Sequence, residues 1–216
     1  MKEYLIRFAN LLSGTFLFSV GVVITLCANV GYAAWDVFHA GLAQTTGMSF
    51  GVASIVAGGV VFIIVTACGE KVGFGTIVNM TMTGVFTDLI LMLDIIPTAT
   101  NFFVGLLMLI LGLYLLAFST YFYMKSAFGA GARDNLMVVM TRKTKLPVGV
   151  CRIIVEIIVT VVGWFLGGMV GVGTVISAFA IGFFIQVTFA MFKFNPTAVK
   201  HETLIQTFKA VKNFMT

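Results

Sequence analysis

The chain has 216 residues, of which 60% are hydrophobic and only 10% are charged, with a formal net charge of +5. Soluble domains carry about 25% charged residues, so this composition excludes a soluble globular enzyme, and the many aromatic residues exclude a disordered chain. The three cysteines, Cys27, Cys68 and Cys151, lie in apolar stretches and do not form a disulfide framework. The composition is that of an integral membrane protein.

Six apolar stretches are long enough to cross a bilayer, whose hydrocarbon core takes about 20 helical residues. They cover roughly 8–30, 49–68, 73–93, 101–123, 147–167 and 172–193. Two further segments, 36–47 and 134–145, are helical in character, but twelve helical residues reach only about 18 Å. We expect these two segments either to re-enter the membrane or to lie along its surface.

The basic residues predict which side each connection lies on. If the N-terminus is cytoplasmic, all thirteen lysines and arginines fall on the cytoplasmic side and the three outer connections contain none. Cytoplasmic loops of membrane proteins carry this excess of positive charge. Trp35 and Trp164 then fall at the outer interface, where an aromatic belt is expected. We therefore predict six spans with both termini in the cytoplasm.

The chain also contains an internal repeat. A shift of 98 residues aligns it with itself without a gap, and 17 of 80 aligned positions are identical. The shift places Asp36 on Asp134 and aligns two Val-Gly-x-Gly-Thr turns, at 72–76 and 170–174. Self-similarity of this kind indicates two structurally equivalent halves.

Each half, about 8–95 and about 101–194, contains three spans and one short segment. Because three is an odd number of crossings, the second half enters the membrane upside down relative to the first. The sequence therefore predicts a single all-α membrane domain of two inverted-topology three-helix repeats, each with a short re-entrant or interfacial helix. Inverted repeats are typical of transporters and channels.

The segments that carry the repeat resemble a known family. The elements 31–36 (Gly-Tyr-Ala-Ala-Trp-Asp), 129–137 and the two Val-Gly-x-Gly-Thr turns are similar to those of the bacterial YczE/YyaS/YitT-type membrane proteins, in particular the YczE-like branch. The resemblance covers roughly 12–190. It implies a multi-span protein of a bacterial cytoplasmic membrane, and it assigns no catalytic or substrate-binding residue.

Ionisable residues inside a membrane are costly, and most face a cavity or a partner. Asp36 and Asp134 each begin a short segment, where an aspartate either caps the helix or marks a polar site at which two helix starts meet near the midplane. Arg133 is either a substrate anchor or the cytoplasmic charge that fixes orientation. His39 lies one turn after Asp36 and is either its proton-exchanging partner or an interfacial hydrogen-bonding residue.

Other polar residues lie within the spans. Glu156 follows Arg152 by four residues on one helical face, so the two can form an ion pair that is either structural or part of the site. Two equivalent pairs of polar residues are also expected to line a path: Asp88 with Gln186, and Asn79 with Ser177. The predicted site residues are Asp36, Asp134, Glu156, Arg133, Asp88, His39, Asn79, Gln186 and Arg152.

The last segment, 195–216, differs from the spans. Leu204, Phe208, Val211 and Met215 recur at helical spacing with lysines elsewhere around the helix. This pattern predicts an amphipathic helix on the cytoplasmic lipid surface. The tail and the positive-inside distribution account for the net positive charge, so we expect no nucleic-acid partner.

These features favour a transporter or channel for a small polar solute. A cationic, zwitterionic or proton-coupled solute fits best, because Asp36 and Asp88 would make the outer vestibule acidic. Two alternatives stay open: a substrate-binding membrane subunit of a larger transporter, and a non-transport accessory membrane protein. Since the sequence has no His/Glu metal constellation and no Gly-x-Ser-x-Gly motif, we expect no enzyme, no cofactor and no metal. The expected partners are the lipid bilayer, a small-molecule or ion substrate, and a second copy or another membrane protein.

Overall fold

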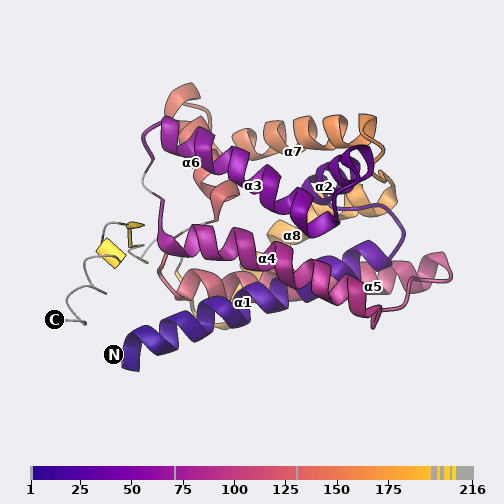
Figure 1. The fold of residues 1–216 in the computed structure, drawn as a ribbon, viewed down its shortest axis with the longest axis horizontal. Helices are drawn as coiled ribbons and strands as arrows, with labels where there is room; N and C mark the ends of the chain where they lie inside the picture. Colours follow the sequence, from indigo (N-terminus) through magenta and orange to yellow (C-terminus); the bar gives the residue numbers. More distant parts are fainter. Residues whose placement is uncertain are drawn as a thin grey trace.

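A computed structural model describes residues 2–70, 72–129, 131–195, 199, 202–204 and 206–207. These residues form eight α-helices and no strand (Figure 1). The helices are α1 (Lys2–Cys27), α2 (Ala34–Thr46), α3 (Phe50–Ala67), α4 (Phe74–Leu93), α5 (Phe102–Lys125), α6 (Ala132–Thr144), α7 (Val148–Phe165) and α8 (Val172–Met191). The all-helical class predicted from the apolar stretches is confirmed.

Five of the described helices, α1, α3, α4, α5 and α8, are long and apolar enough to cross a membrane. A sixth candidate span appears when α6 and α7, which meet at a bend of 117°, are taken together. The helix α7 is 18 residues long and contains both Arg152 and Glu156. α2 and α6 have 13 residues each, in agreement with the two short segments expected from the sequence.

The helices pack so that each half contacts the other. α1 packs against α5, while α4 packs against α1 and α8 against α5. The short helix α2 packs on α7, and the short helix α6 packs on α3, so each short helix contacts a long helix of the other half. In Figure 1, α2, α3, α6 and α7 form an upper layer over α1, α4 and α5.

One end of the bundle, here called the basic end, holds Arg7, Lys125, Arg142, Lys145 and Lys193. The Arg7 side chain donates to the carbonyl of residue 126, just after α5, at 2.8 Å. The Arg142 side chain donates to the carbonyl of residue 68, just after α3, at 2.7 Å. The start of α1 and the ends of α3, α5 and α6 therefore lie at this end.

The other end of the bundle, here called the opposite end, holds the last residues of α1, α2 and α7. The Thr45 hydroxyl donates to the Leu166 carbonyl at 3.0 Å, which joins the end of α2 to the end of α7. The Ala99 amide donates to the Cys27 carbonyl at 2.8 Å, which fixes the connection between α4 and α5 beside the end of α1. No lysine or arginine occurs in the described connections here, 28–33, 94–101 and 166–171.

Positions 98 residues apart make matching contacts between the halves. The Gly75 amide donates to the Phe128 carbonyl at 2.8 Å, and the Gly173 amide donates to the Val30 carbonyl at 2.7 Å. Each bond joins the first turn of a long helix to the chain that precedes a short helix of the other half. Because the shift of 98 residues converts one bond into the other, the two halves contact each other in equivalent ways.

Glycine is required where these two connections cross. Gly31 and Gly129 are equivalent positions, and both have a positive φ, 109° and 137°, which favours glycine. A Cβ on Gly31 would lie 2.6 Å from the Gly171 nitrogen, and a Cβ on Gly129 would lie 2.8 Å from the Gly73 Cα. Gly31 and Gly129 are therefore preserved where the two halves approach closely.

The amphipathic helix expected over 195–216 lies largely outside the described residues, and Phe208, Val211 and Met215 are among those not described. Leu204 packs against the core cluster that contains Val65 and Val72. Its amide donates to the Val72 carbonyl at 3.1 Å. The described part of the tail thus contacts the protein at the basic end.

Candidate functional site

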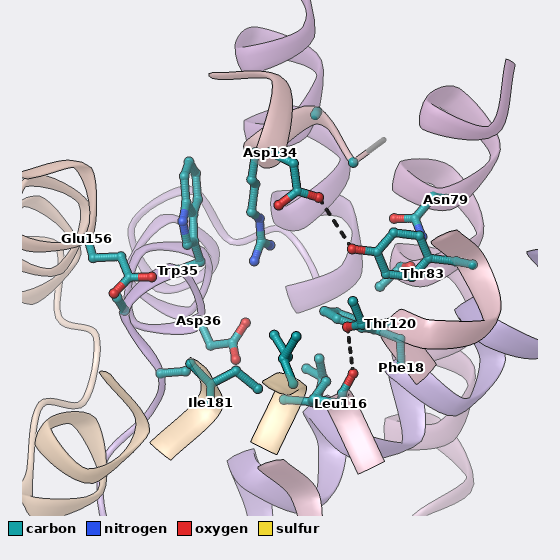
Figure 2. A pocket seen from close by; sticks show the side chains of 18 of the residues that line it. Phe18, Trp35, Asp36, Asn79, Thr83, Leu116, Thr120, Asp134, Glu156 and Ile181 are labelled. Atoms are coloured by element: carbon teal, nitrogen blue, oxygen red, sulfur yellow. Dashed lines mark hydrogen bonds between the residues drawn. The ribbon is translucent and has the colours of Figure 1, made fainter. Parts of the chain in front are cut away.

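A cavity of about 360 Å³ lies between the two halves (Figure 2). All eight helices contribute residues to its wall. Figure 2 shows Asp36, Asp134 and Glu156 reaching the same space from different elements. Small-molecule sites have volumes of about 300–1,000 Å³, so the cavity is large enough for a small solute.

The wall of the cavity follows the internal repeat. Eleven described lining residues belong to the first half, and the residue 98 positions later lines the cavity in every case. These pairs are Phe18/Leu116, Val22/Thr120, Ala33/Gly131, Ala34/Ala132, Trp35/Arg133, Asp36/Asp134, Ser54/Arg152, Gly58/Glu156, Asn79/Ser177, Met80/Ala178 and Thr83/Ile181. The cavity is therefore built from equivalent surfaces of the two halves, although the paired residues often differ in chemistry.

Six more residues line the cavity, and all of them belong to the second half: Leu113, Tyr123, Met124, Met137, Ile185 and Phe189. Tyr123 and Met124 lie in the last turn of α5, and Phe189 lies in the last turn of α8. Both helices end at the basic end, where the ring of Phe192 stacks on that of Tyr121. The cavity therefore extends further toward the basic end than toward the opposite end.

Both short helices begin at the cavity and end at different ends of the bundle. α2 ends beside Leu166 at the opposite end, and α6 ends beside Cys68 at the basic end. Their N-cap residues, Ala33 and Gly131, line the cavity and form no side-chain cap hydrogen bond. The N-terminus of a helix carries partial positive charge and free N–H donors, so two such termini face one space.

Neither aspartate is an N-cap, which corrects one of the two interpretations made from the sequence. Each helix starts two residues earlier than expected, so Asp36 and Asp134 are the third residues of α2 and α6. Both line the cavity. The Asp134 carboxylate accepts a hydrogen bond from the Tyr123 hydroxyl at 3.3 Å. The other interpretation, two helix starts that meet, matches this geometry.

Arg133 lies in the wall of the cavity. Its guanidinium lies over the ring of Trp35, 4.7 Å from the centroid, where the negative face of the ring attracts a cation. One of its nitrogens lies 3.4 Å from His39 Nε2. Trp35, expected at the outer interface, is instead a buried residue of the cavity wall, because α2 starts deep in the bundle.

His39 lies behind the cavity wall. It is 1% exposed, and its Nδ1 lies 3.7 Å from an Asp36 carboxylate oxygen. It contacts both Asp36 and Arg133, so it joins a residue of α2 to a residue of α6. The structure therefore places His39 as a partner of two lining residues and not among the lining residues themselves.

Arg152 and Glu156 form the predicted ion pair on α7. The Arg152 Nε donates to a Glu156 carboxylate oxygen at 2.8 Å, and both residues line the cavity. Their equivalents in the first half are Ser54 and Gly58, so the pair is a feature of the second half alone. It is the one charged pair within 4 Å among the described lining residues.

Of the four other polar residues expected along a path, Asn79 and Ser177 line the cavity, and Asp88 and Gln186 do not. The reason is helical geometry: Asp88 follows Asn79, and Gln186 follows Ser177, by nine residues. At 3.6 residues per turn, nine residues make about two and a half turns. Asp88 and Gln186 therefore point away from the cavity.

Asp88 has a structural role at the opposite end. It accepts hydrogen bonds from the Ser49 hydroxyl and, at 2.6 Å, from the Gly51 amide. Ser49 is the N-cap of α3. Asp88 thus ties α4 to the first turn of α3, whereas Gln186 is exposed on α8.

The two halves differ in how tightly their last two helices pack. A Cβ on Gly84 of α4 would lie 2.6 Å from the Gly51 carbonyl oxygen of α3. The equivalent glycines, Gly149 of α7 and Gly182 of α8, have no heavy atom of the described residues within 4 Å of such a Cβ. α3 and α4 are in close contact, whereas the cavity separates the α7 residue Glu156 from α8.

Sequence reasoning missed several lining residues, notably Trp35, Ser54, Thr83, Thr120 and Tyr123. The repeat carried a usable signal for two of them, because Trp35 and Ser54 are equivalents of the predicted site residues Arg133 and Arg152. Thr120 and Tyr123 lie on α5, whose polar residues are hidden in a strongly apolar stretch. Among the described residues, no cluster of three or more His, Cys, Asp or Glu side chains could hold a metal ion.

Comparison with known proteins gives the same assignment as the repeat motifs. Residues 5–190 match the family described as "Family of unknown function (DUF6198)". The chain belongs to the DUF6198 family. Its relatives include the "Uncharacterized membrane protein YczE" of Bacillus subtilis, with 29% identity over 189 residues, which are 86% of each chain.

A second relative, an "Uncharacterized protein" of Haemophilus influenzae, is 30% identical over 170 residues, which are 79% of this chain and 77% of the relative. No solved structure matches the chain. The resemblance to the YczE-like membrane proteins is confirmed, and the matched range of the DUF6198 family includes every described residue of the cavity wall.

Proposed function

We propose that this DUF6198 protein is a transporter for a small polar solute, with its binding site in the cavity between the two halves. The observation that carries the proposal is the wall itself: each described lining residue of the first half has its equivalent in the wall. A site formed at the interface between internal repeats is the arrangement found in many secondary transporters.

The proposal includes an inverted relation between the halves in the membrane. Two observations support it: α2 runs from the cavity to the opposite end, and α6 runs from the cavity to the basic end. The lysines and arginines of the basic end favour the cytoplasmic side for that end, by the positive-inside rule. We assign the protein to the bacterial cytoplasmic membrane with both termini in the cytoplasm.

A carrier that exposes the cavity to one side at a time accounts for the asymmetry between the halves. At the opposite end, Gly51 and Gly84 bring α3 and α4 into contact. At the basic end, the cavity extends to Tyr123 and Phe189, and the equivalent glycines Gly149 and Gly182 stay apart. The described conformation then faces the cytoplasm, and closure of α7 on α8 would accompany opening of α3 from α4.

The test is solute flux into proteoliposomes that contain the purified protein. A panel of labelled amino acids, amines, carboxylates and inorganic ions is compared for the wild type, Asp36→Asn, Asp134→Asn and the control Asp94→Asn. Asp94 is exposed at the end of α4 and has a positive φ that asparagine tolerates. We expect flux of at least one solute that both cavity variants lose and the control keeps. Unchanged flux in both cavity variants would sink the assignment.

A further inference from the structure

The cavity presents positive and negative charge from separate elements. Arg152 and Glu156 form an ion pair at 2.8 Å, so their opposite charges largely cancel each other. This leaves one guanidinium, that of Arg133, and the two carboxylates of Asp36 and Asp134. No lysine is found among the described lining residues. A solute in the cavity therefore meets one fixed cation and two fixed anions.

The Arg133 guanidinium has unused hydrogen-bonding capacity. Its five N–H donors form a planar fork that matches a carboxylate. Within the described residues, no carboxylate oxygen lies within 4 Å of it, and its contacts are the Trp35 ring and the His39 Nε2. Stacking on Trp35 holds the plane of the guanidinium, which reduces the entropy lost when an anion binds.

The two aspartates offer a site for a cation close to this guanidinium. Asp36 comes from α2 and Asp134 comes from α6, the same helix as Arg133. The neighbours of these carboxylates include the His39 ring, 3.7 Å from Asp36, the Tyr123 hydroxyl, 3.3 Å from Asp134, and the Gly131 amide, which donates to Asp134. A primary ammonium has three donors and no acceptor, so two carboxylates and the Tyr123 oxygen suit it.

Two buried polar atoms beside these charges add hydrogen-bonding capacity. The Asn79 side-chain nitrogen and the Thr83 hydroxyl are buried and have no hydrogen-bond partner among the described residues. Both residues line the cavity, and Figure 2 shows them close together, on the side of the view away from Glu156 and Trp35. Buried polar groups are normally paired, so these atoms indicate a bound polar group or water.

Most of the rest of the wall is apolar. Leu113, Leu116, Ile181, Ile185 and Phe189 come from α5 and α8 and line the cavity with apolar side chains. A hydrocarbon side chain can be buried there, at about 0.8 kcal/mol for each buried CH₂ group. The cavity thus has one region for charged groups and one for an aliphatic or aromatic body.

We infer that the cavity binds a small zwitterion of the amino-acid type, with its carboxylate on Arg133, its ammonium between Asp36 and Asp134, and its side chain against α5 and α8. This inference rests on the proposed function and names its substrate class. A free anion would approach two carboxylates, and a free cation would leave the Arg133 guanidinium without a carboxylate in contact with it. A zwitterion gives Arg133 a carboxylate partner and gives the two aspartates an ammonium, and these contacts offset part of the cost of removing charges from water.

The first experiment uses the wild-type protein and three ligands of one shape. Thermal unfolding of the purified protein is measured with L-leucine, with L-leucinamide, which lacks the carboxylate, and with 4-methylpentanoate, which lacks the ammonium. The remaining amino acids are screened alongside. We expect at least one amino acid to raise the unfolding midpoint in a saturable way, with dissociation constants at least tenfold weaker for its amide and its deamino analogue.

Equal stabilisation by the amide or by the deamino analogue would overturn the inference that the ligand is a zwitterion. The absence of stabilisation by any amino acid would overturn it as well. These outcomes leave the proposed function standing if the flux assay finds another solute that Asp36→Asn and Asp134→Asn abolish. Absence of flux of every solute in the wild-type protein, or unchanged flux in both cavity variants, sinks the proposed function itself. The two failures are therefore distinguishable.

The second experiment tests the assigned contact. Arg133→Gln should weaken binding of the stabilising amino acid at least tenfold and should remove the preference for this amino acid over its amide. Arg133→Lys should keep part of that preference. Arg142→Gln is the matched control, because Arg142 lies at the basic end and pairs with Glu70. If the folded Arg133→Gln protein keeps the wild-type affinity for the amino acid and the wild-type preference over its amide, the assigned contact between Arg133 and the carboxylate is wrong.

Discussion

Arg133 and Trp35 occupy equivalent positions, 98 residues apart, and they lie against each other: the guanidinium carbon is 4.7 Å from the centroid of the indole ring. Both residues line the cavity, so the contact joins the starts of the two short helices there. It also breaks the symmetry of the site, because one half contributes a cation and the other contributes an aromatic face.

The opposite directions of α2 and α6 give a first prediction. Thr46 and Thr144 are equivalent residues, both exposed, at the last positions of the two helices. In a variant without native cysteines, Thr46→Cys should react with a membrane-impermeant maleimide from the outside of the cell. Thr144→Cys should react only after the membrane is opened. Labelling of both positions from the same side would contradict the inverted arrangement.

A matched pair of glycine substitutions tests the asymmetry between the halves. Gly84→Ala places a Cβ 2.6 Å from the Gly51 carbonyl oxygen, and overpacking of this kind costs about 1–3 kcal/mol. Gly182→Ala is the equivalent change at a position with no described heavy atom within 4 Å. Unfolding in detergent should show a loss of stability for Gly84→Ala alone. Equal losses would mean that α7 and α8 pack as closely as α3 and α4.

Much of the fold could be predicted from the sequence because a bilayer imposes helices of a known length on apolar stretches. The repeat identified Asp36 and Asp134 as equivalent residues, and for this reason the starts of the two short helices could be expected to meet. The sequence could not show which face of each helix lines the cavity. Asp88 and Gln186 were expected in the path, but they lie half a turn away from Asn79 and Ser177, on helices that carry polar residues on more than one face.

The position of Trp35 could not be predicted for a different reason. Tryptophan is enriched at membrane interfaces, so its place after an apolar span favoured the outer surface. The helix α2, however, begins at the cavity and runs outward, so its first residues are the deepest ones. The same geometry in the other half places Arg133, the second residue of α6, in the cavity wall.

A third prediction separates the structural role of Asp88 from a role in binding. Asp88→Ala removes the acceptor of the Gly51 amide and the Ser49 hydroxyl, and hydrogen bonds to a charged group contribute about 1.5–3 kcal/mol. The free energy of unfolding should fall by that amount. Gln186→Ala, at the equivalent exposed position, should change it by no more than about 0.5 kcal/mol. The affinity for solute should stay the same in both variants. If the Asp88→Ala protein is stable but has lost solute flux, Asp88 takes part in solute binding or transport.

The ion pair on α7 gives the fourth prediction. The Arg152 side chain is 43% exposed, and an i,i+4 pair of this kind contributes only about 0.3–0.5 kcal/mol to stability. Glu156→Gln should therefore lower stability no more than Glu70→Gln, which breaks the exposed pair with Arg142. Only Glu156→Gln should change the rate of solute flux, because Glu156 lines the cavity and Glu70 does not. Equal flux in the two variants would make the Arg152–Glu156 pair purely structural.

The most direct test of a solute site between the two halves is the reactivity of a cysteine placed in the cavity wall. Ala178 lines the cavity on α8, and Ala178→Cys in a variant without native cysteines can be exposed to an impermeant maleimide in right-side-out and in inside-out vesicles. We predict faster reaction in the inside-out vesicles, which present the basic end, and slower reaction when an amino acid that stabilises the protein is added. Reaction at equal rates from both sides, unaffected by any stabilising solute, would contradict a central binding site.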